Sequence, residues 1–208
     1  AYTVRALCGL INNCGILKRP HADRIARAFK IYKSPAGPNK PKGQAAADFR
    51  QAYCHPSSQV HFVGVWDTVG ALGIPVTFLG LFDGHDEFYN TKMGPNISTA
   101  CHALAIDERR QDFEPTIWKP RPGVALKQVW FAGVHSDVGG SLQPDRGTGL
   151  RASDIPLKWM LDQAAHAGLV IEPHIRTGLK DSPDAKIHKS RKHVYRLKKP
   201  LNRPLEIE

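Results

Sequence analysis

The amino-acid sequence predicts an α/β fold, with a parallel sheet whose two faces are both covered by helices. Residues 60–66 and 126–131 form apolar runs rich in β-branched and aromatic residues, and each run ends in a polar turn, as buried strands do. Segments with the apolar spacing of helices precede, separate and follow these runs. Strands that alternate with helices build parallel sheets, which are buried on both faces.

The first quarter of the chain is expected to be helical. A helix over residues 1–14 stops at Gly15, a basic helix covers residues 21–33, and a third covers residues 45–54 after a loop rich in Pro, Gly and Lys. The apolar residues expected to share one buried face of the first helix are Val4, Leu7, Leu10, Ile11 and Cys14.

The middle of the chain begins with the predicted strand over residues 60–66. Residues 70–95 show no sustained period and are expected to form a long loop over a site, with the apolar stretch 70–82 as a lid or the wall of an acyl-chain pocket. The stretch "ISTACHALAIDERR", residues 97–110, is expected to be a helix with Ser98 as its N-cap.

The last part of the chain holds the second predicted strand, residues 126–131, and one more helix. This helix begins at Ser153 or Asp154 and stops at Gly168. From residue 171 onward the chain is basic and interrupted by prolines.

The net charge of +10 is concentrated at the two ends of the chain. Residues 1–50 carry ten Lys and Arg against two acids, residues 51–173 nine against thirteen, and residues 174–203 ten against two. Such ends could meet an anionic membrane surface, nucleic acid or an acidic partner, although a basic tail is most often a solvated surface. Nucleic acid is the least favoured partner, because the tail has one aromatic residue, Tyr195, and no recognition motif.

The cysteines and the apolar runs bear on the compartment. The four cysteines form no CxxC pair and no Cys/His set with zinc-finger spacing, so we expect free thiols and a reducing compartment. No apolar run reaches the length of a membrane span, and the first residues lack the pattern of a signal peptide. The sequence therefore predicts a soluble protein with no cofactor and no metal.

Two polar residues follow the predicted strands in an order that suggests chemistry. Asp67 comes directly after the first strand and His135 soon after the second, at the carboxyl ends where parallel sheets gather their sites. Asp then His in chain order are the last two members of a Ser/Asp/His set. The alternatives are a strand-end turn shared with Thr68, and an Asx turn or a metal pair formed by His135 and Asp137.

The nucleophile of such a set is missing from these residues. No serine sits in a G-x-S-x-G elbow, and turn or cap roles suit all six of them: Ser57, Ser58, Ser98, Ser136, Ser141 and Ser153. A phosphatase that uses a nucleophilic Asp is also disfavoured, since the second Asp of its signature would replace Val69.

Five stretches together resemble one known family. They are "AYTVRALCGLI", "GVWDTVGALG", "HALAIDERRQDFEPTIW", "VWFAGVHSDVGGS" and "DIPLKWMLDQAAHAGL". In this order they resemble successive blocks of the α/β-hydrolase domain of type VI secretion phospholipase effectors and their uncharacterised bacterial and fungal relatives. The resemblance runs from residue 1 to about residue 170.

The resemblance implies a division of the chain and roles for its residues. Residues 1–170 would be the C-terminal portion of an α/β-hydrolase domain, and residues 171–208 a basic C-terminal extension. The nucleophile elbow would lie about three residues before Ala1, with the first strands of the sheet, so an upstream segment or a partner chain would complete the sheet. Asp67 and His135 match the acid and the base of the family.

Neighbouring residues would support this acid and base. By the same resemblance, Trp66 and Thr68 pack and hydrogen-bond around the acid, and Asp137 ties down the loop of the base. The family often continues the His block with a third Gly and an aromatic residue, where this chain has Ser141 and Leu142, which leaves the neighbouring pocket different in shape.

The function that follows is hydrolysis of carboxylic esters, phospholipid or other lipid esters, by a serine triad. The alternative is a non-catalytic subunit that reuses the hydrolase scaffold inside a larger assembly. The residue at the centre of the upstream elbow discriminates the two, because only the enzyme needs a serine there.

Overall fold

The computed structural model describes residues 2–34, 37–69, 93–191, 193–203 and 205. The proposed lid, residues 70–82, therefore lies outside the described residues. Among those described, no helix is long and apolar enough to cross a membrane.

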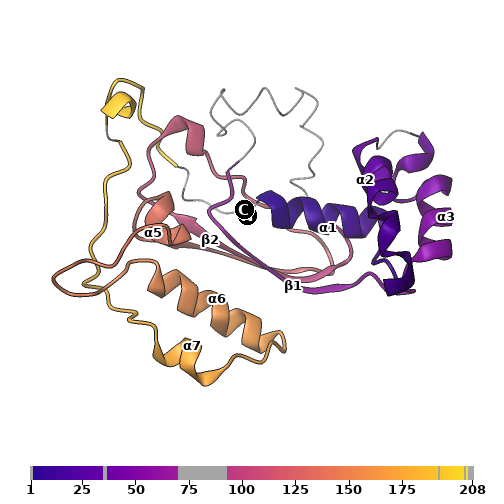
Figure 1. Ribbon diagram of the computed structural model, residues 1–208. Coiled ribbons are helices and arrows are strands. Elements are labelled where there is room, and N and C mark those ends of the chain that lie inside the picture. The colour runs from indigo at the N-terminus through magenta and orange to yellow at the C-terminus, as the bar shows by residue number, and fades with distance from the viewer. Residues whose placement is uncertain (1, 35–36, 70–92, 192, 204, 206–208) are drawn as a thin grey trace.

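Three parallel strands form the centre of the fold (Figure 1). The sheet order is β1 (Val60–Trp66), β2 (Ile97–Ala105) and β3 (Ala125–Phe131), with β2 paired on both sides. The predicted α/β fold with a parallel sheet is confirmed. Its helices and 3-10 turns are α1 (Tyr2–Cys14), η1 (Arg19–Arg24), α2 (Ile25–Lys33), η2 (Gly37–Asn39), α3 (Gln44–Tyr53), η5 (Gln111–Phe113), α5 (His135–Gly139), α6 (Asp154–His166), α7 (Pro173–Thr177) and η6 (His193–Arg196).

Helices cover both faces of the sheet. On one face, Cys8 of α1 packs in a cluster with Val63 and Val65 of β1. On the other, Met160 of α6 packs with small residues of β2, and in Figure 1 α1 and α6 lie on opposite sides of the strands. A Cβ at Gly64 would lie 2.6 Å from the sulfur of Met160, so a glycine there allows α6 to approach β1 closely.

The predicted helix over residues 97–110 is wrong, because this stretch contains the central strand. Ala100 faces the cluster under α1, whereas Cys101 and Ala103 face the cluster under α6. A strand buried on both faces has no polar side and no alternation, and its small residues leave room for the helices. Ser98 is not a cap; its hydroxyl accepts a hydrogen bond from the side chain of Gln59, 2.8 Å away.

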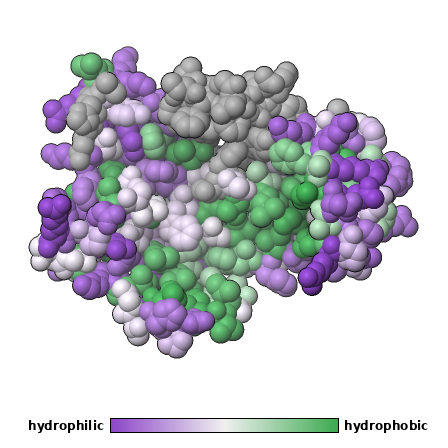
Figure 2. Space-filling model, viewed as in Figure 1, coloured by the Kyte–Doolittle hydropathy of each residue, from purple (hydrophilic) through white to green (hydrophobic). Residues whose placement is uncertain are grey.

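The predicted first helix is confirmed in extent, and its buried face is confirmed in part, because Cys14 is buried in a core cluster and Leu10 packs against that cluster. It ends at Cys14, and Gly15 follows with a φ of 81°. However, Val4 and Leu7 are 40% and 53% exposed, and Figure 2 shows apolar side chains gathered on the surface where α1 lies. Arg5 is buried as well, although it was not predicted to be: it stacks over a tryptophan ring and is held by a hydrogen bond to a backbone carbonyl.

The other helices follow the prediction closely. The basic helix expected over residues 21–33 begins as η1 and continues as α2, and α3 covers the third predicted helix. The helix expected from Ser153 to Gly168 is α6, and Gly168 stops it with a φ of 98°. Together these elements leave one end of the sheet, at the carboxyl ends of β1 and β3, for the candidate site.

Candidate functional site

Asp67 follows β1 directly and is fully buried. Its backbone amide still bonds to the carbonyl of Ala103 in β2, and its Oδ1 accepts a hydrogen bond from the amide of Ala105 at 2.9 Å. The turn gives Asp67 a φ of 35°, and in the described part of the chain no other non-glycine residue has a positive φ. A strained backbone held this firmly is typical of functional positions.

His135 lies against this carboxylate. It is the first residue of α5, four residues after the end of β3, and its Nδ1 lies 2.7 Å from Oδ2 of Asp67. The ring is held from the side by the edge-on ring of Phe113, with 5.1 Å between centroids. With Nδ1 engaged by a carboxylate, Nε2 is the nitrogen that can accept a proton, and the side chain is 31% exposed.

Arg203, from the C-terminal tail, binds the other side of the same carboxylate. Its Nη1 lies 2.5 Å from Oδ1 and its Nη2 3.0 Å from Oδ2 of Asp67, and both side chains are fully buried. Burial alone would raise the pKa of Asp67, but the hydrogen bonds from His135 and Arg203 and the charge of Arg203 outweigh it and lower this pKa. The carboxylate is therefore ionised.

Two acids that follow β2 accept hydrogen bonds from the backbone of the loop that carries His135. Oδ2 of Asp107 accepts a hydrogen bond from the amide of Gly133 at 2.7 Å. The fully buried Glu108 accepts one from the amide of His135 at 3.3 Å and also forms an ion pair with Arg110. Burial would raise the pKa of Glu108, but the hydrogen bonds from Arg110 lower it. Both acids thus hold backbone rather than a ligand.

Asp137 also holds the backbone of this loop. Its Oδ2 accepts hydrogen bonds from the amides of Val134 and His188, at 3.1 and 2.9 Å, and its Oδ1 lies 2.7 Å from Nδ1 of His188. It is buried, so these contacts are shielded from water. The side chain therefore joins α5 to the C-terminal tail.

The remaining sequence-predicted residues lie next to Asp67 in sequence but not all in contact with it. The amide of Thr68 donates to Nε2 of the buried His102, whose pKa burial lowers to about 3, so this ring is neutral. Trp66 points to the opposite face and packs in the cluster with Met160, away from the Asp67 carboxylate. Sequence reasoning missed Glu108 and Arg203 altogether.

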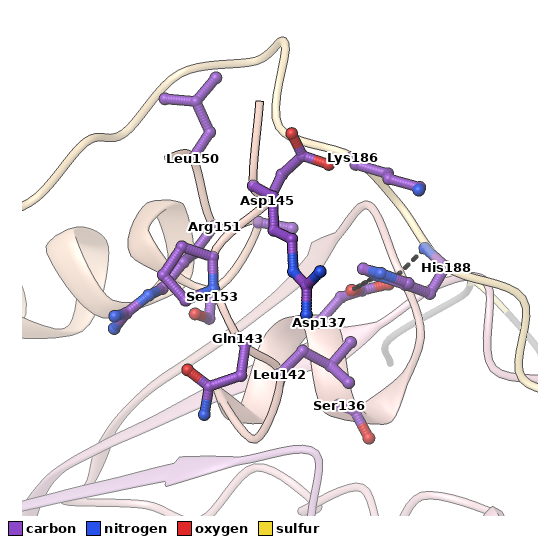
Figure 3. Close-up of a pocket in the computed structure, with 13 residues that line it drawn as sticks. Ser136, Asp137, Leu142, Gln143, Asp145, Leu150, Arg151, Ser153, Lys186 and His188 are labelled. Atoms are coloured by element: carbon purple, nitrogen blue, oxygen red, sulfur yellow. Dashed lines mark hydrogen bonds and ion pairs between the residues drawn. The ribbon is translucent and has the colours of Figure 1, made fainter. Parts of the chain in front are cut away.

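A cavity of about 310 Å³ borders α5 (Figure 3). Its lining includes Ser136 and Asp137, but neither Asp67 nor His135 lines it. The basic side chains on its wall are Arg146, Arg151, Lys186 and His188. This basic wall is formed by the loop after α5 and by the tail.

Neither a metal site nor the nucleophile is found in the described part of the chain. No group of three or more His, Cys, Asp and Glu side chains in that part could hold a metal ion. The polar contacts of His135 there are to Asp67 and Glu108, so no described serine hydroxyl is hydrogen-bonded to its ring. The described residues thus orient the imidazole of His135 against a buried carboxylate.

Comparison with known proteins gives two matches. The family model described as "T6SS, Phospholipase effector Tle1-like, catalytic domain" matches residues 1–163. The uncharacterized protein YEL023C of Saccharomyces cerevisiae (strain ATCC 204508 / S288c) is 24% identical over 128 residues, which are 59% of this chain and 18% of the yeast protein. The match thus spans less than a fifth of that relative. No solved structure matches significantly.

Proposed function

This chain belongs to the family of Tle1-like phospholipase effectors of the type VI secretion system and matches their catalytic domain. We propose that it supplies the acid and the base of a serine hydrolase. Asp67 is the acid and His135 the base, and the substrate is a carboxylic ester of a lipid. The observation that carries the proposal is the 2.7 Å contact between Nδ1 of His135 and the buried carboxylate of Asp67.

The nucleophile is the serine of an elbow that the resemblance places about three residues before Ala1. α1 is then the helix that follows the elbow, and the upstream strands add to the sheet at the open edge of β1. The pairing of the sheet is compatible with this extension, because within the described residues β1 pairs with β2 alone and keeps one open edge. The α/β-hydrolase architecture of the whole domain is part of the same proposal.

The reaction proceeds through an acyl-enzyme. Nε2 of His135 takes the proton of the serine hydroxyl while its oxygen bonds to the ester carbonyl carbon. When the C–O bond to the alcohol breaks, the imidazolium returns that proton to the leaving oxygen. Water then repeats the sequence on the acyl-enzyme and releases the carboxylic acid. Asp67 keeps the proton on Nδ1 and stabilises the imidazolium throughout.

Trp66, Thr68 and Asp137 support the pair from a distance. Thr68 links the turn of Asp67 to β2 through His102, and Asp137 holds the loop of His135. Trp66 anchors the end of β1 on α6 by packing. The exposed cations of the tail are free to meet an anionic membrane surface, where each adds on the order of 1 kcal/mol.

Lipid hydrolysis by the full-length protein tests the proposal. Phosphatidylglycerol vesicles are incubated with wild type, Asp67→Asn and the control Asp23→Asn, whose carboxylate is exposed in η1, and released fatty acid is measured. Wild type and Asp23→Asn are expected to hydrolyse the lipid, and Asp67→Asn to lose roughly 10³- to 10⁴-fold in rate. A folded wild type that releases no fatty acid from these or neutral vesicles would favour the non-catalytic scaffold.

A further inference from the structure

The C-terminal tail returns to the candidate site at several points. After α7 it passes α5, turns at η6 and comes back towards the end of the sheet (Figure 1). His188 binds Asp137, Ser190 accepts a hydrogen bond from the amide of Arg109, and Leu201 donates one to the carbonyl of Arg109. The tail residues of these contacts all lie beyond residue 163, where the family match ends, whereas their partners lie within the match.

Arg203 makes the deepest of these contacts. Besides both oxygens of Asp67, its guanidinium donates to the carbonyl of Ala105 at the end of β2 and to the carbonyl of Phe113 in η5. One side chain thus joins β1, β2 and η5. The planar fork of an arginine suits a carboxylate in this two-bond geometry, which a lysine cannot reproduce.

Arg203 is buried against Asp67, so this part of the tail is not simply a solvated surface. A buried ion is costly unless it is paired and hydrogen-bonded, and Asp67 and Arg203 both have no exposed side-chain surface. Another cation of the tail differs in this respect, because Lys198 pairs with Asp112 at the surface, where the two side chains are 50% and 35% exposed. The tail therefore places one particular cation on one particular carboxylate, rather than a general positive charge.

We infer that Arg203 is a positioning residue for Asp67 and His135, so that the C-terminal tail contributes this one side chain to the active site. The inference rests on the proposed function in so far as the pair is catalytic. Arg203 fixes the orientation of the carboxylate, so that Oδ2 stays directed at His135 while Oδ1 is occupied. It also offsets part of the negative charge that faces the imidazole.

The charge has a direction that can be measured. The groups that face His135 are Asp67 after β1, Arg203 from the tail, and Glu108 with Arg110 after β2. Asp137 is on its own helix, and the neutral His102 adds no charge near pH 7. Removal of Arg203 leaves the carboxylate uncompensated, which favours the protonated imidazole. The acid limb of activity should then move to higher pH.

The test uses the full-length protein and a fluorophosphonate probe, whose labelling rate is measured from pH 5 to 9. The variants are Arg203→Gln, which removes the charge, Arg203→Lys, which keeps it without the fork, and Arg196→Gln as an exposed control in the same tail. Labelling of Arg203→Gln is expected to slow roughly 10- to 100-fold, with the acid limb of its pH profile at higher pH than that of wild type. Arg203→Lys is expected to slow but to keep the wild-type limb, and Arg196→Gln to match wild type.

Some results would overturn the inference. One is that Arg203→Gln keeps the labelling rate and the acid limb of wild type. Another is that both Arg203 variants lose labelling only in proportion to the folded protein that they lose. If Arg203→Gln does not fold, a wild-type rate in Arg203→Lys overturns the positioning role.

A measurement without catalysis separates this inference from the proposed function. The imidazole of His135 is titrated by NMR in wild type and the same variants. A midpoint that moves to higher pH in Arg203→Gln alone supports the inference even if the wild type takes no probe, in which case only the proposed function fails. An unchanged midpoint overturns the charge effect.

Discussion

The carboxylate of Asp137 and the ring of His188 form a second Asp–His contact, 2.7 Å long, two residues from His135. It resembles the Asp67–His135 contact in its distance but differs in its surroundings. Asp137 also accepts hydrogen bonds from two backbone amides, so it links α5 to the tail.

Loss of the contacts of Asp137 should reduce the stability of the fold. Asp137→Ala leaves the buried amide of Val134 and the partly buried amide of His188 without this acceptor, so the free energy of unfolding should fall by about 1–3 kcal/mol. His188→Ala removes one partner and should cost less. Urea unfolding of the single and double variants measures the coupling, and His174→Ala, at a largely exposed histidine, is the control. Additive effects of the two substitutions would contradict a direct interaction.

Gly133 should not tolerate a side chain. Its φ is 113°, and a Cβ there would lie 2.6 Å from the Cβ of Asp137. Gly133→Ala is expected to displace the loop of His135, which lowers both the melting temperature and lipid hydrolysis. Gly139→Ala, at the end of α5, is the matched control, because a Cβ there meets nothing within 4 Å. Equal melting temperatures for the two variants would show that the loop is not held as described.

The buried His102 should make stability depend on pH. Its pKa is lowered to about 3 in the fold, chiefly by burial, from the ordinary value of about 6.5. Between these values the unfolded chain binds a proton that the folded chain does not, so stability falls as pH drops from about 6.5 towards 3.

The variant His102→Gln tests this assignment. Gln can accept the hydrogen bond from the amide of Thr68 but does not titrate. Denaturant unfolding between pH 4.5 and 7 should therefore show a shallower slope of stability against pH for His102→Gln than for wild type. Parallel slopes would mean that His102 is not the group responsible.

The four cysteines should be unreactive in the folded protein. All are buried and unpaired, and burial raises the pKa of Cys14 and of Cys101 to about 11. Since the thiolate is the reactive form, iodoacetamide at pH 8 should leave all four unmodified until the protein is unfolded in guanidinium. Peptide mapping by mass spectrometry identifies each site. Rapid native modification of any of these residues would contradict its burial.

The comparison between sequence and structure shows why one strand was missed. β1 and β3 carry β-branched and aromatic residues and were predicted, whereas β2 is rich in Ala and lies between two strands and two layers of helices. Its identity as a strand depends on partners distant in sequence, which local propensity does not contain. Had it been recognised, Asp107 and Glu108 would have stood out as acids beyond a strand end, as Asp67 did.

The site was predicted where it depends on strand ends and missed where it depends on the tail. Asp67 and His135 were singled out from the sequence, and the structure brings them together. Arg203 is one of ten basic residues between residues 174 and 203, and nothing local distinguishes it from the others. Only the path of the chain in three dimensions shows that it reaches Asp67, 136 residues earlier.

Labelling of the full-length protein with a fluorophosphonate probe, followed by mass spectrometry to locate the adduct, tests the central claim most directly. The account predicts one adduct, on a serine shortly before Ala1, that is lost in His135→Ala although this variant stays folded. The absence of any adduct on folded wild type, or an adduct that persists in His135→Ala, would contradict the claim that Asp67 and His135 serve a serine nucleophile.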